Sequence, residues 1–288
     1  MTQNNSEATS PEKHNATSPA SLPAFARSPI NRCNLPALIL GGLTFQHHPV
    51  PLYIDGIREL HWRFFRALDG ISEAPVRALH FRQYMCSAFL LGQSEQAGLD
   101  PSSSGIQRDK ADYLRLLRGW MFNADGIEAA VIKRWVESRF GLLTLNHRGA
   151  LGDHNSEAYA VYQADYVRGL YNSNALETQL DLLYSYCQYE LWRQWPERVH
   201  WRLYRGVNQL EEHDVINRID SRQSVLLLNN LNSFSGDRDH SDTFGDVILE
   251  MQVPAAKLLY FPELLPGVLQ GEREYLVIGG VYRTLLSR

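Results

Sequence analysis

The spacing of hydrophobic residues changes once along the chain. Between about residues 56 and 195 they recur every three or four positions, as in "GIRELHWRFFRALDG" and "GIEAAVIKRWVESRFG". This period places hydrophobic side chains on one face of a helix. The clearest stripe lies in "NALETQLDLLYSYCQYELWRQW", where it consists of Leu176, Leu180, Leu183, Cys187 and Leu191. We therefore expect residues 36–195 to be mainly helical.

After Pro196 the pattern becomes one of short β-rich runs separated by polar or Pro/Gly segments. The runs are "VHWRLYRGV", "SVLLLNNL", "DVILEMQVP", "KLLYF", "EYLVIGG" and "YRTLL". A group of strands that follows a group of helices is typical of an α+β fold. We predict one domain over residues 36–288, with a β-rich core in residues 196–288.

The first 35 residues have a different composition. They begin "MTQNNSEATSPEKHNATSPASLPAF" and are rich in Ser, Thr, Asn and Pro. Such a segment buries too little apolar surface to offset the entropy of ordering it. We predict a flexible tail over residues 1–35.

Composition and charge exclude several classes of protein. The 28 basic and 32 acidic residues give a net charge of −4, which predicts no nucleic-acid partner. The three cysteines are far apart and predict neither a disulfide framework nor a zinc site. No apolar run approaches the roughly 20 residues of a transmembrane helix, and no signal-peptide core precedes the domain. We expect a cytoplasmic protein without a transmembrane segment.

Two carboxylates open one of the predicted strands. Glu272 and Glu274 are two positions apart, so on a strand they face the same side at roughly 6.5 to 7 Å along it. Such a pair can bind a metal, flank a sugar C–O or C–N bond, or orient a basic group. An isolated pair of this kind is usually a solvated strand end.

Two other segments change this interpretation. Arg205 and Gly206 end an otherwise apolar or aromatic strand, where a guanidinium fits a diphosphate and a glycine lets a ligand approach the backbone. Ser233 and Ser235 alternate on a second strand, from which their hydroxyls can hold a neighbouring carboxylate. Each segment is weak evidence by itself.

In this order, Arg-Gly, Ser-x-Ser and Glu-x-Glu resemble the arginine-serine-glutamate signature of the ADP-ribosyltransferases. The closer resemblance is to the dinitrogenase reductase ADP-ribosyltransferases, which "HHPVPLYIDGIRE" and "DYLRLLRGWMFNADGIEAAVIKRWVESRFGL" also resemble. The similarity covers residues 36 to about 285 and implies an ADP-ribosyltransferase-type core.

The resemblance implies a role for each residue of the signature. Arg205 would bind the phosphates of NAD, and the Gly206 backbone would bind the nicotinamide amide. Ser233 would orient Glu274, which would bond the 2′-hydroxyl of the nicotinamide ribose. Glu272 would engage an acceptor arginine. Ser235 is also assigned to NAD binding.

The sequence departs from the wider superfamily at Phe234, where many members have threonine. Phe234 alternates with the serines, and we expect it to pack on the opposite face. In the family, the loop "PELLPGVLQG" that precedes the glutamates recognises the target protein.

The remaining candidates receive simpler interpretations. His47 and His48 have no matching ligand spacing, and we predict no metal. The segment "GDRDHSDTFGD" lacks the terminal glutamate of a calcium loop and is expected near the active site. No G-x-G-x-x-G turn supports a Rossmann site. Arg139 is expected on the surface, and the tryptophans of the helices in the core: Trp62, Trp120, Trp135 and Trp192.

The sequence therefore predicts an NAD-dependent mono-ADP-ribosyltransferase that modifies an arginine. By family resemblance the target is dinitrogenase reductase, the iron protein of nitrogenase, so that modification reversibly stops nitrogen fixation. A PII-type signalling protein would be a second partner. The alternatives are an NAD glycohydrolase, which needs Glu274 but not Glu272, and a non-catalytic module that senses NAD or a regulator.

Overall fold

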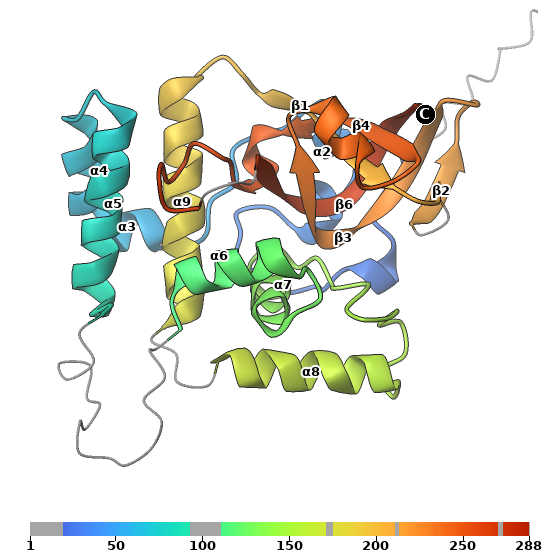
Figure 1. Cartoon of the computed structure of the whole chain (residues 1–288), viewed down its shortest axis with the longest axis horizontal. Helices are drawn as coiled ribbons and strands as arrows, with labels where there is room; N and C mark the ends of the chain where they lie inside the picture. The colour runs from blue at the N-terminus through green and yellow to red at the C-terminus, as the bar shows by residue number, and fades with distance from the viewer. Residues whose placement is uncertain (1–19, 93–110, 171–174, 211–212, 270–272, 288) are drawn as a thin grey trace, which may run out of the picture.

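The computed structural model of the chain describes residues 20–92, 111–170, 175–210, 213–269 and 273–287 (Figure 1). Up to residue 195 its named elements are helices, as the hydrophobic period predicts. They are η1 (Ala24–Ala26), α1 (Ala37–Leu40), α2 (Leu43–His47), α3 (Ile57–Leu60), α4 (Trp62–Asp69), α5 (Ala74–Phe89), α6 (Tyr113–Phe122), α7 (Ile127–Phe140), α8 (Glu157–Leu170) and α9 (Leu176–Gln194).

The strands follow the helices. They are β1 (His200–Val207), β2 (Asp214–Arg218), β3 (Gln223–Ser235), β4 (Val247–Pro254), β5 (Leu258–Tyr260) and β6 (Glu274–Ser287), with α10 (Arg238–Asp242) and η3 (Ala255–Lys257) between them. This mixture of helices and an antiparallel sheet confirms the α+β class. The strand β2 was not predicted, and the two last predicted runs are one long strand, β6.

The six strands form one sheet in the order β2-β3-β1-β4-β6-β5, and β3 also pairs with β6. The strands β3, β1, β4 and β6 therefore form a closed circuit of hydrogen-bonded neighbours. All of these pairings are antiparallel. The long strand β6 holds the circuit together, because it pairs with β3, β4 and β5.

A bulge in β3 attaches the sheet to the helices. The register with β6 shifts between Leu228 and Leu231. A Cβ at Gly279 on β6 would lie 1.7 Å from the carbonyl oxygen of Asn229, so only glycine fits opposite the bulge. The buried Asn230 amide then donates to the main-chain oxygens of Lys133, at 2.8 Å, and Leu142, at 3.2 Å. The bulge thus anchors β3 to α7.

The helices cover the sheet from two directions (Figure 1). In this view α9 stands between the α3–α5 group and the sheet, and α6, α7 and α8 lie below the sheet. One large cluster of buried hydrophobic side chains extends from the helices into the strands. All five residues of the stripe predicted on α9 are buried, which confirms that prediction.

The helix α9 also buries charged residues on its other faces. Asp181 accepts hydrogen bonds from Arg139 Nε at 2.7 Å and from Trp135 Nε1 at 2.7 Å. Glu190 forms a buried ion pair with Arg77, with Nε and Oε1 2.7 Å apart. The prediction that Arg139 lies on the surface was therefore wrong. Its charge is tolerated inside because a carboxylate on a neighbouring helix compensates it.

Two other predictions about burial were wrong. Residues 20–35 are not a flexible tail, since Leu22, Ala26 and Cys33 are buried in the main cluster. Residues 1–19 lie outside the described residues. Trp62 and Trp192 are exposed, whereas Trp120 and Trp135 are buried as predicted.

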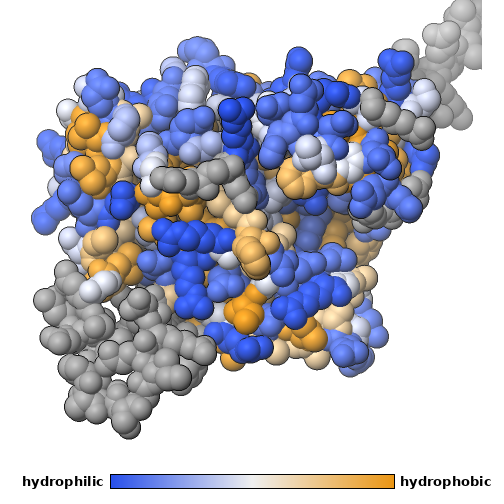
Figure 2. All heavy atoms as spheres, viewed as in Figure 1, coloured by the Kyte–Doolittle hydropathy of each residue, from blue (hydrophilic) through white to orange (hydrophobic). Residues whose placement is uncertain are grey.

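Hydrophilic residues cover most of the face seen in Figure 2, and apolar residues form separate small groups on it. Among the described helices, none is both long enough and apolar enough to cross a bilayer.

Candidate active site

Three strands bring the predicted site residues to one edge of the sheet. Arg205 lies near the end of β1, Ser233 near the end of β3, and Glu274 is the first residue of β6. In the antiparallel register Ser235 pairs with Glu274 across β3 and β6, and Tyr204 pairs with Ser235 across β1 and β3. Residues separated by up to 69 positions in the sequence are therefore neighbours here.

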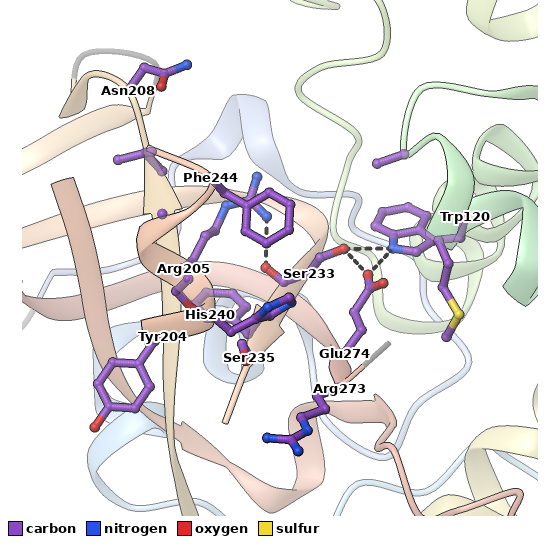
Figure 3. Close-up of a pocket in the computed structure, with 16 residues that line it drawn as sticks. Trp120, Tyr204, Arg205, Asn208, Ser233, Ser235, His240, Phe244, Arg273 and Glu274 are labelled. Carbon is purple, nitrogen blue, oxygen red and sulfur yellow. Dashed lines mark hydrogen bonds between the residues drawn. The ribbon is translucent and has the colours of Figure 1, made fainter. Parts of the chain in front are cut away.

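The three side chains form a connected group (Figure 3). The hydroxyl of Ser233 donates a hydrogen bond to Oε1 of Glu274. The guanidinium of Arg205 donates through Nη1 to the carbonyl oxygen of Ser233, at 2.8 Å. The structure thus brings Arg205, Ser233 and Glu274 together, although their roles toward NAD stay a prediction.

Trp120 on α6 is a fourth member of this group, although its sequence pattern predicts only a core residue. Its indole Nε1 lies 2.9 Å from Ser233 Oγ and 3.0 Å from Glu274 Oε1, so its single N–H is shared between them. The side chain is 2% exposed. A tryptophan on the apolar face of a helix has the pattern of a core residue, so no signal in the sequence distinguishes it.

Gly206 and Ser235 each stabilise the local structure at the end of a strand. A Cβ on Gly206 would lie 2.2 Å from the carbonyl oxygen of Ser241 and 3.0 Å from the nitrogen of Gly245. The glycine thus allows the backbone of residues 241–245 to pack against β1 on that side. The hydroxyl of Ser235 accepts a hydrogen bond from the Asp237 amide at 3.0 Å, where β3 turns toward α10. Both residues still line the cavity described next.

A cavity of about 540 Å³ opens beside the group, and its size lies in the range of ligand-binding pockets. Trp120 and Met121 of α6 form one wall, and the ends of β1 and β3 form another. His240 and Phe244 contribute a third, with their rings edge-to-face at 5.3 Å. The segment 236–246 was expected near the active site, and the cavity confirms this.

Phe234 is buried in the main hydrophobic cluster, although it also borders the cavity that Ser233 and Ser235 line. The expected packing role of Phe234 is therefore confirmed. Arg273, next to Glu274, also lines the cavity and lies 3.5 Å from a carboxylate oxygen of Asp237. Glu272 lies outside the described residues.

The segment before the glutamates is described only over residues 262–269. Leu264 and Leu265 are buried in the main hydrophobic cluster, and Val268 and Leu269 pack against it. The apolar side chains of this loop thus have a packing function. Leu264 and Leu265 are not exposed to a partner.

The arrangement can stabilise a positive charge and hold an anion at adjacent points. A carboxylate in a cavity lowers the energy of a cationic transition state more than that of a neutral ground state. A guanidinium nearby presents a planar set of donors to phosphate oxygens. A reaction that requires both is the loss of a base from the ribose of a dinucleotide, in which positive charge develops on the ribose beside a diphosphate.

Comparisons with known proteins agree with this chemistry. A sequence model of the family described as dinitrogenase reductase ADP-ribosyltransferase matches residues 30–286. The chain is 40% identical over 254 residues to the NAD(+)--dinitrogen-reductase ADP-D-ribosyltransferase of Rhodospirillum rubrum, which covers 88% of this chain and 92% of that protein. No solved structure gives a significant match.

These findings first define the class of the protein, which is that of the ADP-ribosyltransferases. Within this class, the chain belongs to the dinitrogenase reductase ADP-ribosyltransferase family.

Proposed function

We propose that this chain transfers ADP-ribose from NAD to an arginine of dinitrogenase reductase. The observation that carries the proposal is the hydrogen-bonded group of Arg205, Ser233 and Glu274 at the wall of a cavity. Both the family match and the similarity to the Rhodospirillum rubrum enzyme support it. The modification would attach a bulky, anionic group to the surface of the iron protein and so block its docking on nitrogenase.

In this proposal Arg205 binds the diphosphate of NAD, and the Gly206 backbone binds the nicotinamide amide. Ser233 and Ser235 line the same part of the cavity. Glu274 lies against the nicotinamide ribose and accepts a hydrogen bond from its 2′-hydroxyl. As the bond between nicotinamide and the anomeric carbon breaks, positive charge develops on the ribose, and the Glu274 carboxylate stabilises it. Nicotinamide leaves with the bonding electron pair.

The acceptor guanidinium then forms the new bond to the anomeric carbon through one of its nitrogens. A protonated guanidinium has a pKa above about 12 and is a poor nucleophile, so a base must hold it and take its proton. We assign this task to Glu272, two positions before Glu274. The products are ADP-ribosylated arginine, nicotinamide and one proton.

The family resemblance also supports three finer proposals. The sheet is an ADP-ribosyltransferase-type core that forms one domain with the helices. A PII-type signalling protein is a second partner, which would connect the activity to nitrogen supply. The protein acts in the cytoplasm.

The test is to incubate the protein with NAD labelled in its adenosine half and purified dinitrogenase reductase. Mass spectrometry should find one ADP-ribose on an arginine of the iron protein. An iron protein that stays unlabelled while nicotinamide is released would favour a glycohydrolase. An unlabelled protein with bound but intact NAD would favour a sensing module.

The variant E272Q tests the assignment of the second carboxylate. It should still release nicotinamide from NAD, because Glu274 is intact, but transfer to arginine should be lost. Transfer at the wild-type rate would show that Glu272 does not engage the acceptor.

A further inference from the structure

A second cavity, of about 550 Å³, adjoins the first and has no part in the mechanism above. The two cavities share four lining residues, namely Trp120, Ala124, Arg205 and Ser233. Arg205 and Trp120 therefore form the boundary between them. The rest of the second wall has four apolar residues and seven polar ones, and the polar ones include two carboxylates, Asp125 and Asp214, and the buried Lys133.

Asp125 presents an oriented carboxylate to this second cavity. It lies between α6 and α7, and its side chain is 43% exposed. Its Oδ1 accepts a hydrogen bond from Lys133 Nζ at 2.8 Å, whereas Oδ2 has no hydrogen-bond partner among the described residues. Burial alone would raise the pKa of Asp125, but the bond and charge of Lys133 outweigh it, so its pKa is lowered. The carboxylate is ionised at neutral pH.

The buried Lys133 holds this carboxylate in place through its ammonium group. The lysine is 2% exposed, and its ammonium group contacts Asp125, the carbonyl oxygen of Asn146 at 3.0 Å and Nδ1 of His147 at 3.4 Å. An ammonium group has three N–H donors, so these contacts use all of them. Burying a lysine is costly unless its ammonium group has partners. Here the hydrogen bond from the buried ammonium group fixes the position of Asp125 Oδ1.

His147 continues the chain of contacts away from the cavity. Its Nε2 lies 3.2 Å from Oδ2 of the buried Asp165. Burial lowers the pKa of His147, so its imidazole is neutral. With Nδ1 accepting from Lys133, Nε2 carries the hydrogen and donates it to Asp165. Asp125 is thus held in place by a series of contacts through the buried residues Lys133, His147 and Asp165. None of these residues has a role in the transfer reaction proposed above.

NAD consists of two ribonucleosides joined through a diphosphate. In the proposed function the first cavity receives the nicotinamide ribose, and Arg205 binds the diphosphate at the boundary. The second cavity then lies where the adenosine half must go. A carboxylate beside a ribose accepts a hydrogen bond from the 2′-hydroxyl, and it repels a phosphate at that position.

We propose that the second cavity binds the adenosine half of NAD, and that Asp125 accepts a hydrogen bond from the 2′-hydroxyl of its ribose. Asp125 is then the residue that selects NAD over NADP. This inference rests on the proposed function, because it assumes that NAD occupies the first cavity.

The first test leaves the protein unchanged and alters the ligand. Wild-type protein is assayed for nicotinamide release with NAD, with NADP and with NAD that lacks the 2′-hydroxyl of the adenosine ribose. The missing hydroxyl should raise KM about tenfold, the value of one hydrogen bond to a charged group. The kcat should stay near that of NAD, because the reacting ribose is unaffected. NADP should be the poorest substrate.

The second test repeats these assays with D125N. Asparagine keeps the shape and an oxygen for Lys133 but removes the charge, so the preference for NAD over NADP should fall by about tenfold or more. The missing hydroxyl should now cost much less than in the wild type, as in a double-mutant cycle between contacting groups. E157Q is the matched control, because Glu157 is an exposed carboxylate on α8 and lines neither of the two cavities. It should leave the NAD to NADP ratio unchanged.

Several results would overturn the inference. One is an equal penalty for the missing hydroxyl in the wild type and in D125N. Another is an unchanged NAD to NADP ratio in D125N. A third is a raised KM for the iron protein alone, which would assign Asp125 to the acceptor. If D125N fails to fold, the wild type alone decides. An equal KM for NAD and for NAD without the adenosine 2′-hydroxyl would then refute the inference. A wild type that neither cleaves nor transfers NAD would instead refute the proposed function.

Discussion

The indole N–H of Trp120 is the contact whose removal tests the site most selectively. The substitution W120F keeps an aromatic ring on α6 but deletes the donor that lies 2.9 Å from Ser233 Oγ and 3.0 Å from Glu274 Oε1. We expect Glu274 to lose one of the groups that fix its carboxylate beside the cavity. In the proposed function Trp120 is thus a positioning residue, which acts through Glu274.

The expected magnitude follows from the type of bond. A hydrogen bond to a charged group contributes about 1.5 to 3 kcal/mol. If this energy is lost in the transition state, the rate constant falls roughly 10- to 150-fold. The loss should appear in kcat, since in the proposed function the substitution leaves Arg205 and the rest of the NAD-binding cavity in place. The KM for NAD should change by less than about threefold.

The substitution W135F is a matched control. Trp135 on α7 is also buried, and its Nε1 also donates to a carboxylate, that of Asp181, at 2.7 Å. Trp135 lines neither of the two cavities at the site. Both variants should melt at a lower temperature, because each loses ring volume and a buried hydrogen bond. Only W120F should lose kcat.

The assay is the rate of nicotinamide release and of label transfer, measured at a temperature where circular dichroism shows both variants folded. A folded W120F whose kcat stays within about twofold of that of W135F would refute the reasoning. The bond from Trp120 to Glu274 would then have no role in catalysis.

Three further predictions concern other residues. R205K keeps the charge but loses the planar fork and the bond to the Ser233 carbonyl, so a titration of NAD should show binding weaker by about tenfold or more. G206A places a Cβ 2.2 Å from the Ser241 carbonyl, so residues 241–245 must shift, and we expect a higher KM for NAD in steady-state assays. Lys257 is buried between Phe45 and Tyr282, and burial lowers its pKa to about 7. The unfolded chain then binds a proton between pH 7 and about 10.4 that the folded chain does not, so stability rises with pH in this window. Urea unfolding of the wild type should give a gain on the order of 2 kcal/mol from this residue between pH 7 and 9, and K257M should lack that gain.

The sequence predicted the parts of the fold that depend on local pattern. The stripe on α9 and the alternation at Ser233, Phe234 and Ser235 each identify a buried face, because the backbone fixes which residues share a side. The order of helices and strands therefore gave the α+β class. Strand β2 was missed because most of its residues are exposed and lack an alternating apolar pattern.

Properties that arise from pairing between distant segments were less predictable. Arg139 is buried because Asp181, 42 positions later, neutralises it. Residues 20–35 have few large aliphatics, yet Leu22 and Ala26 pack into the core because the helices offer a surface for them. In both cases the partner that decides burial is absent from the local sequence.

The site shows the same division. Arg205, Ser233 and Glu274 were identified through a known signature, and the antiparallel register explains why they meet. Trp120 is 113 positions from Ser233 and 154 from Glu274, and its local pattern is that of any core tryptophan. The backbone role of Gly206 toward NAD stays a prediction. The structure adds a packing reason for this glycine, because the backbone of residues 241–245 lies where a Cβ would be.

The central claim is that Glu274, held by Ser233 and Trp120 near Arg205, drives cleavage of NAD for transfer to arginine. The most direct measurement compares wild type and E274Q for binding of NAD by calorimetry and for transfer of labelled ADP-ribose to dinitrogenase reductase. We predict that E274Q binds NAD within a few-fold of wild type but transfers about a hundred- to a thousandfold more slowly, the scale of losing one principal electrostatic group. Transfer by E274Q at a rate close to that of the wild type would contradict the account.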